Sequence, residues 1–313
     1  MKTSAAVIAY ISHKRALGML FRAEGAILKA FCKETGDIPF ATVTASAVHV
    51  FLEGSGPVTE YWAKKHNVLS GLYKFAMARS WVSIVPLPHS IPKPVAPMFV
   101  PYIYSQAELK RMLDAVPAAC TKRSVIDADV FRTLILLLYG AGLRLGEALA
   151  FSMADVDLPQ ACLEVHETKF FKHRLVPIGA DLLRVMREYV GKRNETYADG
   201  ADAPFLCKRD GSKLTQTAAR NAFRRVLVIA LIARDGGPRR QPRFHDLRHT
   251  AAVHRLVAWY RNGVDLQERL PRLATYLGHV DLSSTQRYLT MTPELLTEAS
   301  LRFERYAMGA DHV

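Results

Sequence analysis

A run of thirteen residues, VPLPHSIPKPVAP at 85–97, holds five prolines and interrupts the first third of the chain. Each proline lacks a backbone N–H donor and pushes the preceding residue toward extended backbone, so neither a helix nor a central strand is expected to run through this segment. We therefore predict a stiff linker at 85–98. It separates domains at 1–84 and 99–313. Half of the 313 residues are hydrophobic, so each domain can bury a core of its own.

The first domain is predicted to consist of four helices, because apolar side chains recur there at helical spacing. Thr44 or Ser46 can cap the third helix and Thr59 the fourth, since their hydroxyls accept from free N–H groups of a first turn. The predicted helices span 4–17, 22–34, 44–53 and 59–81. The buried stripe of the fourth helix is expected to contain Tyr61, Leu69, Leu72, Tyr73 and Ala76.

In the second domain, hydrophobic residues recur at helical spacing in some segments and alternate as in strands in others. Ser105 and Glu108 form a capping-box pattern before a helix, and the apolar segment 125–142 predicts a core helix that stops at Gly140 or Gly142. The segments 161–168 and 173–178 are typical of strands, with 168–172 as a hairpin tip. Helical patterns then resume and continue to a last helix at 293–307. The expected fold class is mainly α with a small antiparallel β-sheet (α+β).

The charge balance predicts a polyanionic partner. Lys and Arg number 42 against 29 Asp and Glu, which gives a net charge of +13 and an isoelectric point near 9.7. Such an excess is typical of proteins that bind nucleic acid, although a basic but inert surface is the alternative. The four cysteines are far apart and form no CxxC pair, so neither a zinc site nor a disulfide framework is expected. We expect a cytoplasmic, nucleoid-associated protein without a membrane span or signal peptide.

Two basic residues stand at unusual places in the predicted second domain. Arg144 follows the turn YGAG, where glycines let a phosphate or another backbone come close. Lys169 lies at the predicted hairpin tip with Lys172 nearby, and this tip also carries two phenylalanines, which is unusual for a turn that faces only solvent. By itself, each of these residues is more often simply exposed.

A third basic stretch, RRQPRFHDLRHTAA at 239–252, concentrates positive charge. His245 and Arg248 are three residues apart, so they share a face of a helix. His249 is expected to point elsewhere and is interpreted as structural. Five arginines fall between 234 and 248, and their repulsion favours a bound anion. Those leading into the helix are Arg239, Arg240 and Arg243.

The stretch LGHVDLSSTQRYLT places His279 nine residues before Tyr288. A tyrosine alone is more often a core aromatic than a nucleophile. The order of an arginine, a hairpin lysine, HxxR, LGH and then a tyrosine nevertheless resembles the tyrosine recombinase (phage integrase) family. The resemblance covers 99–313, and the first domain is similar, more loosely, to the core-binding domain of that family. The matching residues are Arg144, Lys169, His245, Arg248, His279 and Tyr288.

This resemblance implies cleavage and rejoining of DNA through a 3′-phosphotyrosyl intermediate. Arg144 and Arg248 would bind the phosphate, and Lys169 would protonate the leaving 5′-oxygen. His245 would accept or relay the proton of Tyr288 or hold the phosphate, and His279 would donate to a phosphate oxygen. The phosphotyrosyl linkage keeps the energy of the broken phosphodiester bond, so rejoining needs no ATP and no cofactor is expected. We find no carboxylate cluster for a two-metal site and no GxxxxGK[ST] loop, and we predict cleavage that survives EDTA.

The resemblance also implies the partners: double-stranded DNA with specific recombination sites, clamped by both domains, and a homo-tetramer in the synaptic complex. The last helix could pack on a neighbouring protomer or on its own domain. A type IB topoisomerase, a telomere resolvase and a non-catalytic DNA-binding protein on the same fold are the alternatives. Further DNA contacts, for which solvent exposure is the alternative, are predicted at Lys64, Lys65, Lys172, Arg220, Arg224, Arg225, Arg239, Arg240 and Arg243.

Overall fold

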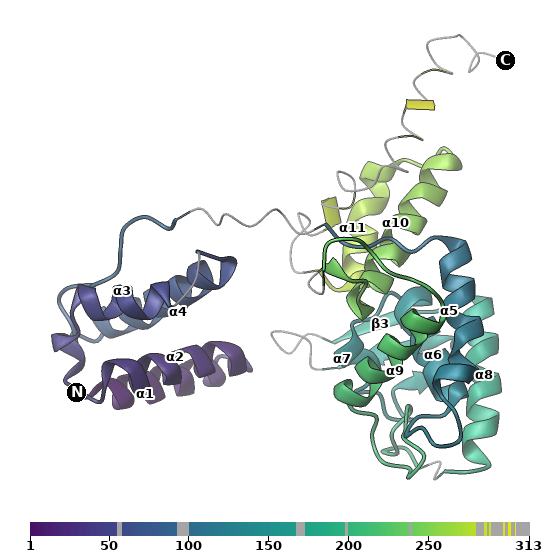
Figure 1. Ribbon diagram of the computed structural model, residues 1–313, viewed down its shortest axis with the longest axis horizontal. Coiled ribbons are helices and arrows are strands. Elements are labelled where there is room, and N and C mark those ends of the chain that lie inside the picture. The colour runs from purple at the N-terminus through teal and green to yellow at the C-terminus, as the bar shows by residue number, and fades with distance from the viewer. Residues whose placement is uncertain are drawn as a thin grey trace. The chain divides into compact units, whose positions relative to one another are not determined.

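The computed structural model describes residues 1–54, 58–92, 100–166, 173–197, 200–237 and 240–279, together with Thr285, Gln286, Tyr288, Thr297, Ser300, Leu301 and Glu304. The chain divides into two compact units, with the boundary between Phe99 and Val100 (Figure 1). Each unit has its own buried apolar clusters. None of the described helices is long and apolar enough to span a membrane.

The described part of the first unit contains four α-helices and a short 3-10 helix. Thr44 accepts from the N–H of Ala47, and Thr59 accepts from the N–H of Tyr61, so both caps are present as predicted. The helices are α1 (Thr3–Ala16), α2 (Arg22–Thr35), α3 (Ala45–Glu53) and α4 (Glu60–Met77), with η1 at Phe40–Thr42. Leu28, Phe31, Leu69, Leu72 and Tyr73 are among the residues fully buried between them.

The predicted buried stripe of α4 is wrong at its first position. Tyr61 is 53% exposed, whereas Trp62 is buried in its place. Trp62 precedes Leu69 by seven residues, or almost two helical turns, and the two side chains therefore share one face. Tyr61 falls off this face, and the ammonium of Lys65 lies 5.4 Å from its ring centroid.

The described part of the predicted linker belongs to the first unit. Val85 and Leu87 pack against the core of that unit, and the His66 imidazole Nε2 lies 3.0 Å from the Pro88 carbonyl oxygen. The first compact unit therefore extends beyond residue 84, where we placed the end of the first domain. The last two prolines of this segment, Pro94 and Pro97, lie outside the described residues.

The second unit is mostly helical with a small antiparallel sheet, which confirms the predicted fold class. Its strands are ordered β1-β2-β3, and β1 was not predicted. The strands are β1 (Val156–Asp157), β2 (Cys162–Val165) and β3 (Arg174–Pro177). The helices are α5 (Gln106–Ala119), α6 (Ala128–Gly140), α7 (Leu145–Ala148), α8 (Ala180–Asn194), α9 (Gln216–Ile229), α10 (Phe244–Arg261) and α11 (Leu266–Leu277). The predicted hairpin tip and most of the last helix lie outside the described residues.

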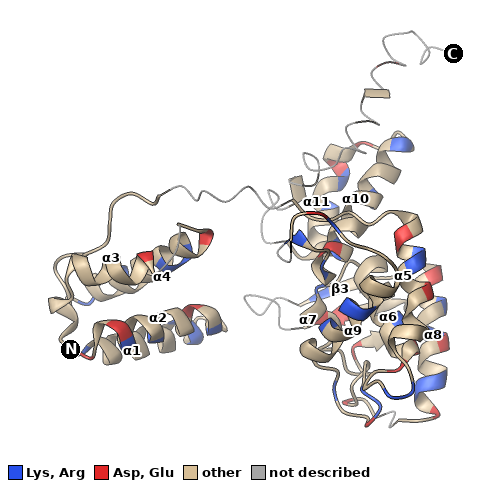
Figure 2. Cartoon of the chain, viewed as in Figure 1, with Lys and Arg blue, Asp and Glu red and all other residues tan. Residues whose placement is uncertain are grey.

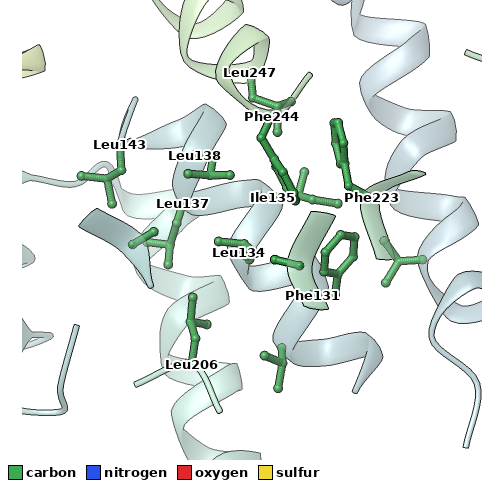
Figure 3. Packing of buried hydrophobic residues seen from close by; sticks show 14 of the residues in the cluster. Phe131, Leu134, Ile135, Leu137, Leu138, Leu143, Leu206, Phe223, Phe244 and Leu247 are labelled. Atoms are coloured by element: carbon green, nitrogen blue, oxygen red, sulfur yellow. The ribbon is translucent and has the colours of Figure 1, made fainter. Parts of the chain in front are cut away.

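Helix α6 is the centre of this unit. It packs against α5, α8 and α10, and its Phe131 and Leu134 are fully buried (Figure 3). Phe244 at the start of α10 stacks on Phe223 of α9 with ring centroids 4.0 Å apart. This packing anchors the N-terminal turn of α10, the helix that carries HxxR, against the same core as α6.

The turn after α6 requires glycine. Gly142 has a φ of 61°, in the left-handed region, and a Cβ there would lie 2.8 Å from the Leu277 side chain. The chain can therefore turn tightly against the end of α11. It then enters α7 with Arg144 as the N-cap residue.

Candidate functional site

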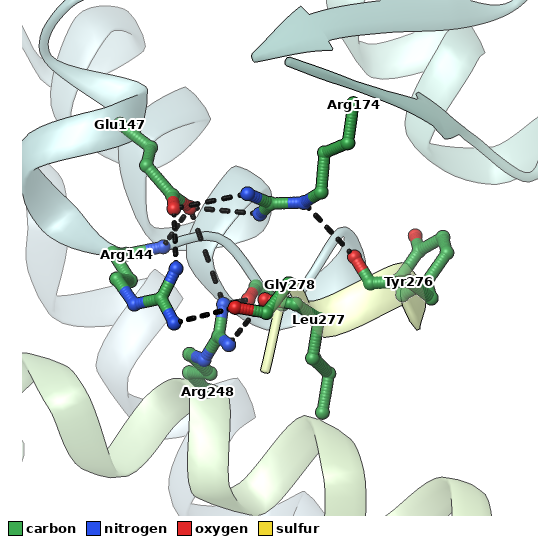
Figure 4. Close-up of polar contacts among 8 residues, drawn as sticks. Arg144, Glu147, Arg174, Arg248, Tyr276, Leu277 and Gly278 are labelled. Atoms are coloured by element: carbon green, nitrogen blue, oxygen red, sulfur yellow. Dashed lines mark hydrogen bonds and ion pairs between the residues drawn. The ribbon is translucent and has the colours of Figure 1, made fainter. Parts of the chain in front are cut away.

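Arg144 and Arg248 are brought together at the C-terminal end of α11. Arg248, on α10, donates from NH1 to the Gly142 carbonyl oxygen at 2.7 Å and from NH2 to the Leu277 carbonyl oxygen (Figure 4). Arg144 donates from NH2 to the Gly278 carbonyl oxygen at 2.9 Å. Consecutive carbonyls of the LGH motif thus hold two arginines that are far apart in the sequence.

Glu147 joins these arginines to a third. Its Oε1 accepts from Arg144 NH1 at 2.7 Å, and its two oxygens accept from Arg174 at 3.1 and 2.9 Å. Arg248 NH1 lies 4.0 Å from Glu147 Oε2. Burial alone would raise the pKa of this carboxyl, but the hydrogen bonds and charges of Arg174 and Arg144 outweigh it and hold the pKa at about 2. Glu147 is therefore ionised at neutral pH.

The sequence interpretation missed both Glu147 and Arg174. The available signal was the spacing, because Glu147 is three residues after the N-cap and its Oε2 accepts from the Arg144 backbone N–H at 2.9 Å. Arg174 begins β3, and its Nε donates to the Tyr276 carbonyl oxygen at 3.1 Å. The pair therefore connects the sheet, α7 and the end of α11.

The local charge favours an anion. Arg248 is 1% exposed, and burial and then the nearby Arg144 lower its pKa to about 10, so it stays cationic at neutral pH. With Arg174, three guanidiniums surround the single negative charge of Glu147. A phosphate would offset the remaining positive charge and could accept bidentate hydrogen bonds from guanidinium groups.

Gly278 makes the close approach of these groups possible. It ends α11 with a φ of 67°, and a Cβ there would lie 2.7 Å from Arg174 NH1. His279 follows directly, and its Nδ1 lies 2.6 Å from the Thr285 hydroxyl oxygen. The His279 and Tyr288 ring centroids are 6.1 Å apart.

Tyr288 lies in an apolar cluster of α10 and α11 and is 3% exposed. Its hydroxyl oxygen is 3.0 Å from His249 Nδ1. The interpretation of His249 as a residue that points elsewhere is therefore wrong. Positions three and four residues after His245 both neighbour it on a helix, so Arg248 and His249 can face one site. The His245 and His249 ring centroids are 4.5 Å apart.

The surroundings keep this pair neutral. Burial raises the pKa of Tyr288, and the charges of Arg248 and Arg144 oppose that shift. Burial and then His245 lower the pKa of His249 to about 3. The pKa of His245 is also lowered, first by burial of part of the ring and then by the charge of Arg248. Because another part of the side chain is exposed, solvent reduces the size of this pKa shift. At neutral pH, a neutral imidazole thus faces a protonated phenol.

A comparison with known families identifies the chain. The model of the "Phage integrase family" matches residues 104–294, well over half of the sequence. The chain belongs to the phage integrase family, the tyrosine recombinases. The predicted resemblance is confirmed at the level of the family.

Relatives of this recombinase carry corresponding names. The chain is 34% identical over 307 residues to a Sinorhizobium fredii protein named as an integrase/recombinase, y4rB, with 96% of each chain covered. It is 29% identical to the tyrosine recombinase XerC of Myxococcus xanthus, covering 75% of this chain and 73% of that protein. The Tn1549 transposon integrase, solved in complex with transposon right end DNA, shares the fold with a TM-score of 0.71 at 15% identity, covering 98% of this chain and 100% of that one.

The other residues predicted to bind DNA in the catalytic unit of this recombinase divide into three groups. Arg220, Arg224 and Arg240 are exposed. The first two lie on α9, where Figure 2 shows Lys or Arg positions in blue. Arg225 and Arg243 are also exposed, but each has a partner within the protein. Arg225 donates from Nε to the Ala119 carbonyl oxygen at 3.0 Å, and Arg243 caps α10 with its NH2 3.4 Å from an oxygen of Asp246. Lys169, Lys172 and Arg239 lie outside the described residues.

In the first unit, the predicted DNA contacts have partners within the protein. Lys64 lies 3.9 Å from a carboxylate oxygen of Glu24. Lys65 donates to the Phe51 carbonyl oxygen at 2.5 Å and lies over the Phe51 ring. Lys65 therefore donates a hydrogen bond to the last turn of α3, where the carbonyl oxygens have no helical N–H partners.

Proposed function

We propose that this protein is a site-specific DNA recombinase in which Tyr288 attacks a DNA phosphate and forms a 3′-phosphotyrosyl intermediate. The observation that carries the proposal is the contact of the Tyr288 hydroxyl with His249, one residue from Arg248. A nucleophile, a neutral imidazole and two permanent cations then belong to one site. Phosphoryl transfer to a protein side chain can use these groups as nucleophile, base and charge-stabilising cations.

The reaction balances without a metal or ATP. Arg144 and Arg248 bind the non-bridging oxygens, where charge develops. The Tyr288 oxygen bonds to phosphorus as its proton passes to an imidazole, that of His249 or His245. The bond from phosphorus to the 5′-oxygen breaks, and Lys169 is proposed to protonate that oxygen. Attack of a 5′-hydroxyl on the phosphotyrosine reverses these steps and joins a strand.

The bound phosphate itself is proposed to activate the imidazoles. After burial, the neighbouring His245, Arg243 and Arg248 contribute to the low pKa of His249, and the two arginines are positively charged at neutral pH. The singly charged phosphodiester of DNA near these groups compensates their charge and raises the imidazole pKa. Proton transfer from Tyr288 is then easier when DNA is present than when it is absent.

Recombination between two sites breaks four strands, and each protomer is proposed to supply one tyrosine. We therefore propose a homo-tetramer on two specific DNA sites, with duplex DNA bound by both units. The net charge of +13 supports binding of a polyanion. The exposed guanidiniums of Arg220 and Arg224 are proposed phosphate contacts.

A nicked suicide substrate tests the proposal. The nick lets the short 5′-hydroxyl strand diffuse away, so a covalent adduct accumulates on denaturing gels. Tyr288→Phe should bind DNA and form no adduct. Tyr139→Phe is the matched control, because the Tyr139 hydroxyl lies 2.9 Å from His254 Nδ1 in a comparable pair outside the site. An adduct in Tyr288→Phe would remove this residue from the nucleophile role.

Two further outcomes separate the alternatives. Adduct formation with relaxation of supercoiled DNA but no exchange between two sites would indicate a topoisomerase-like enzyme. DNA binding without any adduct in the wild type would indicate a non-catalytic DNA-binding protein.

A further inference from the structure

Two exposed histidines, His166 and His173, lie next to each other, immediately after the end of β2 and immediately before the start of β3. Leu163 and Val165 are buried, so the alternating residues Glu164 and His166 face solvent on the other side. Val165 pairs with Arg174 in the antiparallel register, and the next pair in that register is His166 and His173. Directly opposed side chains lie on one face of a sheet. The two Nδ1 atoms are accordingly 2.9 Å apart.

A carboxylate orients the first histidine. Asp155 Oδ1 lies 2.8 Å from His166 Nε2, while Asp155 Oδ2 accepts from the Ser152 backbone N–H at 2.7 Å and its hydroxyl at 2.8 Å. The Nε2 of a neutral His166 therefore carries the proton toward Asp155, and its Nδ1 directs a lone pair at His173. A carboxylate that orients one nitrogen of an imidazole, while the other nitrogen presents its lone pair to a ligand, is the arrangement that supports metal-ligating imidazoles.

A third ligand is within reach. One ligand atom each from Glu164, His166 and His173 lie within 4.8 Å of one another. Zinc binds imidazole nitrogen and carboxylate oxygen at about 2.0–2.2 Å, which places tetrahedral ligands roughly 3.3 Å apart. The Glu164 carboxylate lies 3.7 Å from His166 Nε2, and its side chain is exposed, so a change of rotamer can bring it toward the two imidazoles.

We propose that Glu164, His166 and His173 bind one divalent transition-metal ion of the Zn²⁺ type, with water as the fourth ligand and Asp155 as the orienting carboxylate. Nitrogen ligands favour Zn²⁺, Cu²⁺ or Ni²⁺ over Mg²⁺ and Ca²⁺. The proposal departs from the expectation of a chain without a metal site. That expectation considered cysteine pairs and carboxylate clusters, whereas these two histidines are seven residues apart and become neighbours through the strand register.

The site has a structural consequence. His166 and His173 flank residues 167–172, the segment that contains Lys169. A metal ion would join the two ends of this segment and would take no part in phosphoryl transfer. Its effect on the position of Lys169 rests on the proposed function, whereas metal binding does not.

Zinc titration of the chelator-treated full-length protein, by calorimetry with Zn²⁺ alone, tests the site. The wild type should bind one equivalent, and His166→Gln and His173→Gln should each lose it. Asp155→Asn should bind about tenfold more weakly, because it removes an orienting partner. His49→Gln is the matched control: His49 contacts Glu53 at 3.0 Å on the surface of the other unit and should leave binding unchanged.

Each contrary outcome overturns the proposal. A wild type that binds no equivalent of Zn²⁺ excludes the site. Zinc retained in His166→Gln would place the ion elsewhere on the protein. Competition by millimolar Mg²⁺ would indicate a nonspecific carboxylate site. The Tyr288→Phe variant should bind Zn²⁺ as the wild type does, so failure of metal binding and failure of strand cleavage can be distinguished.

Discussion

Replacement of Glu147 by Gln should destabilise the catalytic unit and misplace its phosphate-binding arginines. The substitution keeps the shape of the side chain and removes the charge that contacts Arg144 and Arg174. Glutamine also introduces N–H donors where guanidiniums already donate. Removing one partner from a buried ionic network is strongly destabilising, because the remaining charges lose their compensation.

The magnitude follows from the pKa of Glu147. It falls from 4.5 to about 2 on folding. Such a lowered pKa contributes stability that is fully present above pH 4.5 and is lost as the pH falls through 2. A difference of about 2.5 units corresponds to about 3 kcal/mol at neutral pH. For a unit of this size, that loss lowers Tm by roughly 6–12 °C.

The assay is a double-mutant cycle with Arg174→Met, measured by urea denaturation at pH 7.5. We expect Arg174→Met to cost much less in the Glu147→Gln background than in the wild type, with a coupling of about 2 kcal/mol. Covalent adduct formation by Glu147→Gln should slow by about 100-fold, because small displacements of catalytic groups have effects of that size.

Glu188→Gln is the control for this experiment. Glu188 pairs with Arg184 at 3.2 Å, but both side chains are more than half exposed. Exposed pairs contribute roughly 0–1 kcal/mol. If Glu147→Gln were no more destabilising than Glu188→Gln, or if the two substitutions in the cycle were additive, the inference of a coupled network would be refuted.

Three further outcomes are expected. Adduct formation should persist in EDTA, and its loss in both the wild type and His166→Gln would indicate a catalytic metal. Because the folded-state pKa of His249 is about 3 against an ordinary 6.5, stability should fall as the pH drops below 6.5, by about 1.4 kcal/mol at pH 5.5. His249→Gln should remove that part of the pH dependence. If the pH dependence of urea unfolding were the same in His249→Gln as in the wild type, protonation of His249 would not be its cause. Arg224→Ala should lower the salt slope of DNA binding by about one unit, whereas an unchanged slope would mean no phosphate contact there.

The sequence was most informative where local chemistry decides the structure. Ser105 and Glu108 form the predicted capping box, and α6 ends at the predicted Gly140. Two strands were recognised from their alternation and pair as a hairpin. Tyr61 was misplaced because a helical stripe is set by the partners that cover it, and Trp62 aligns better with Leu69. The prediction of Lys169 as the general acid remains a prediction.

The residue types proposed for phosphoryl transfer can be recognised from the sequence, because arginines, histidines and a tyrosine must be encoded whatever their arrangement in space. Their order and the charge of +13 therefore determined the family and the expected chemistry. Only the tertiary structure decided which side chains meet. The packing of α10 and α11 puts His249 beside Tyr288, the end of α11 places Glu147 among three arginines, and the strand register brings His166 to His173. These contacts depend on packing and register between segments distant along the chain, which no local pattern records.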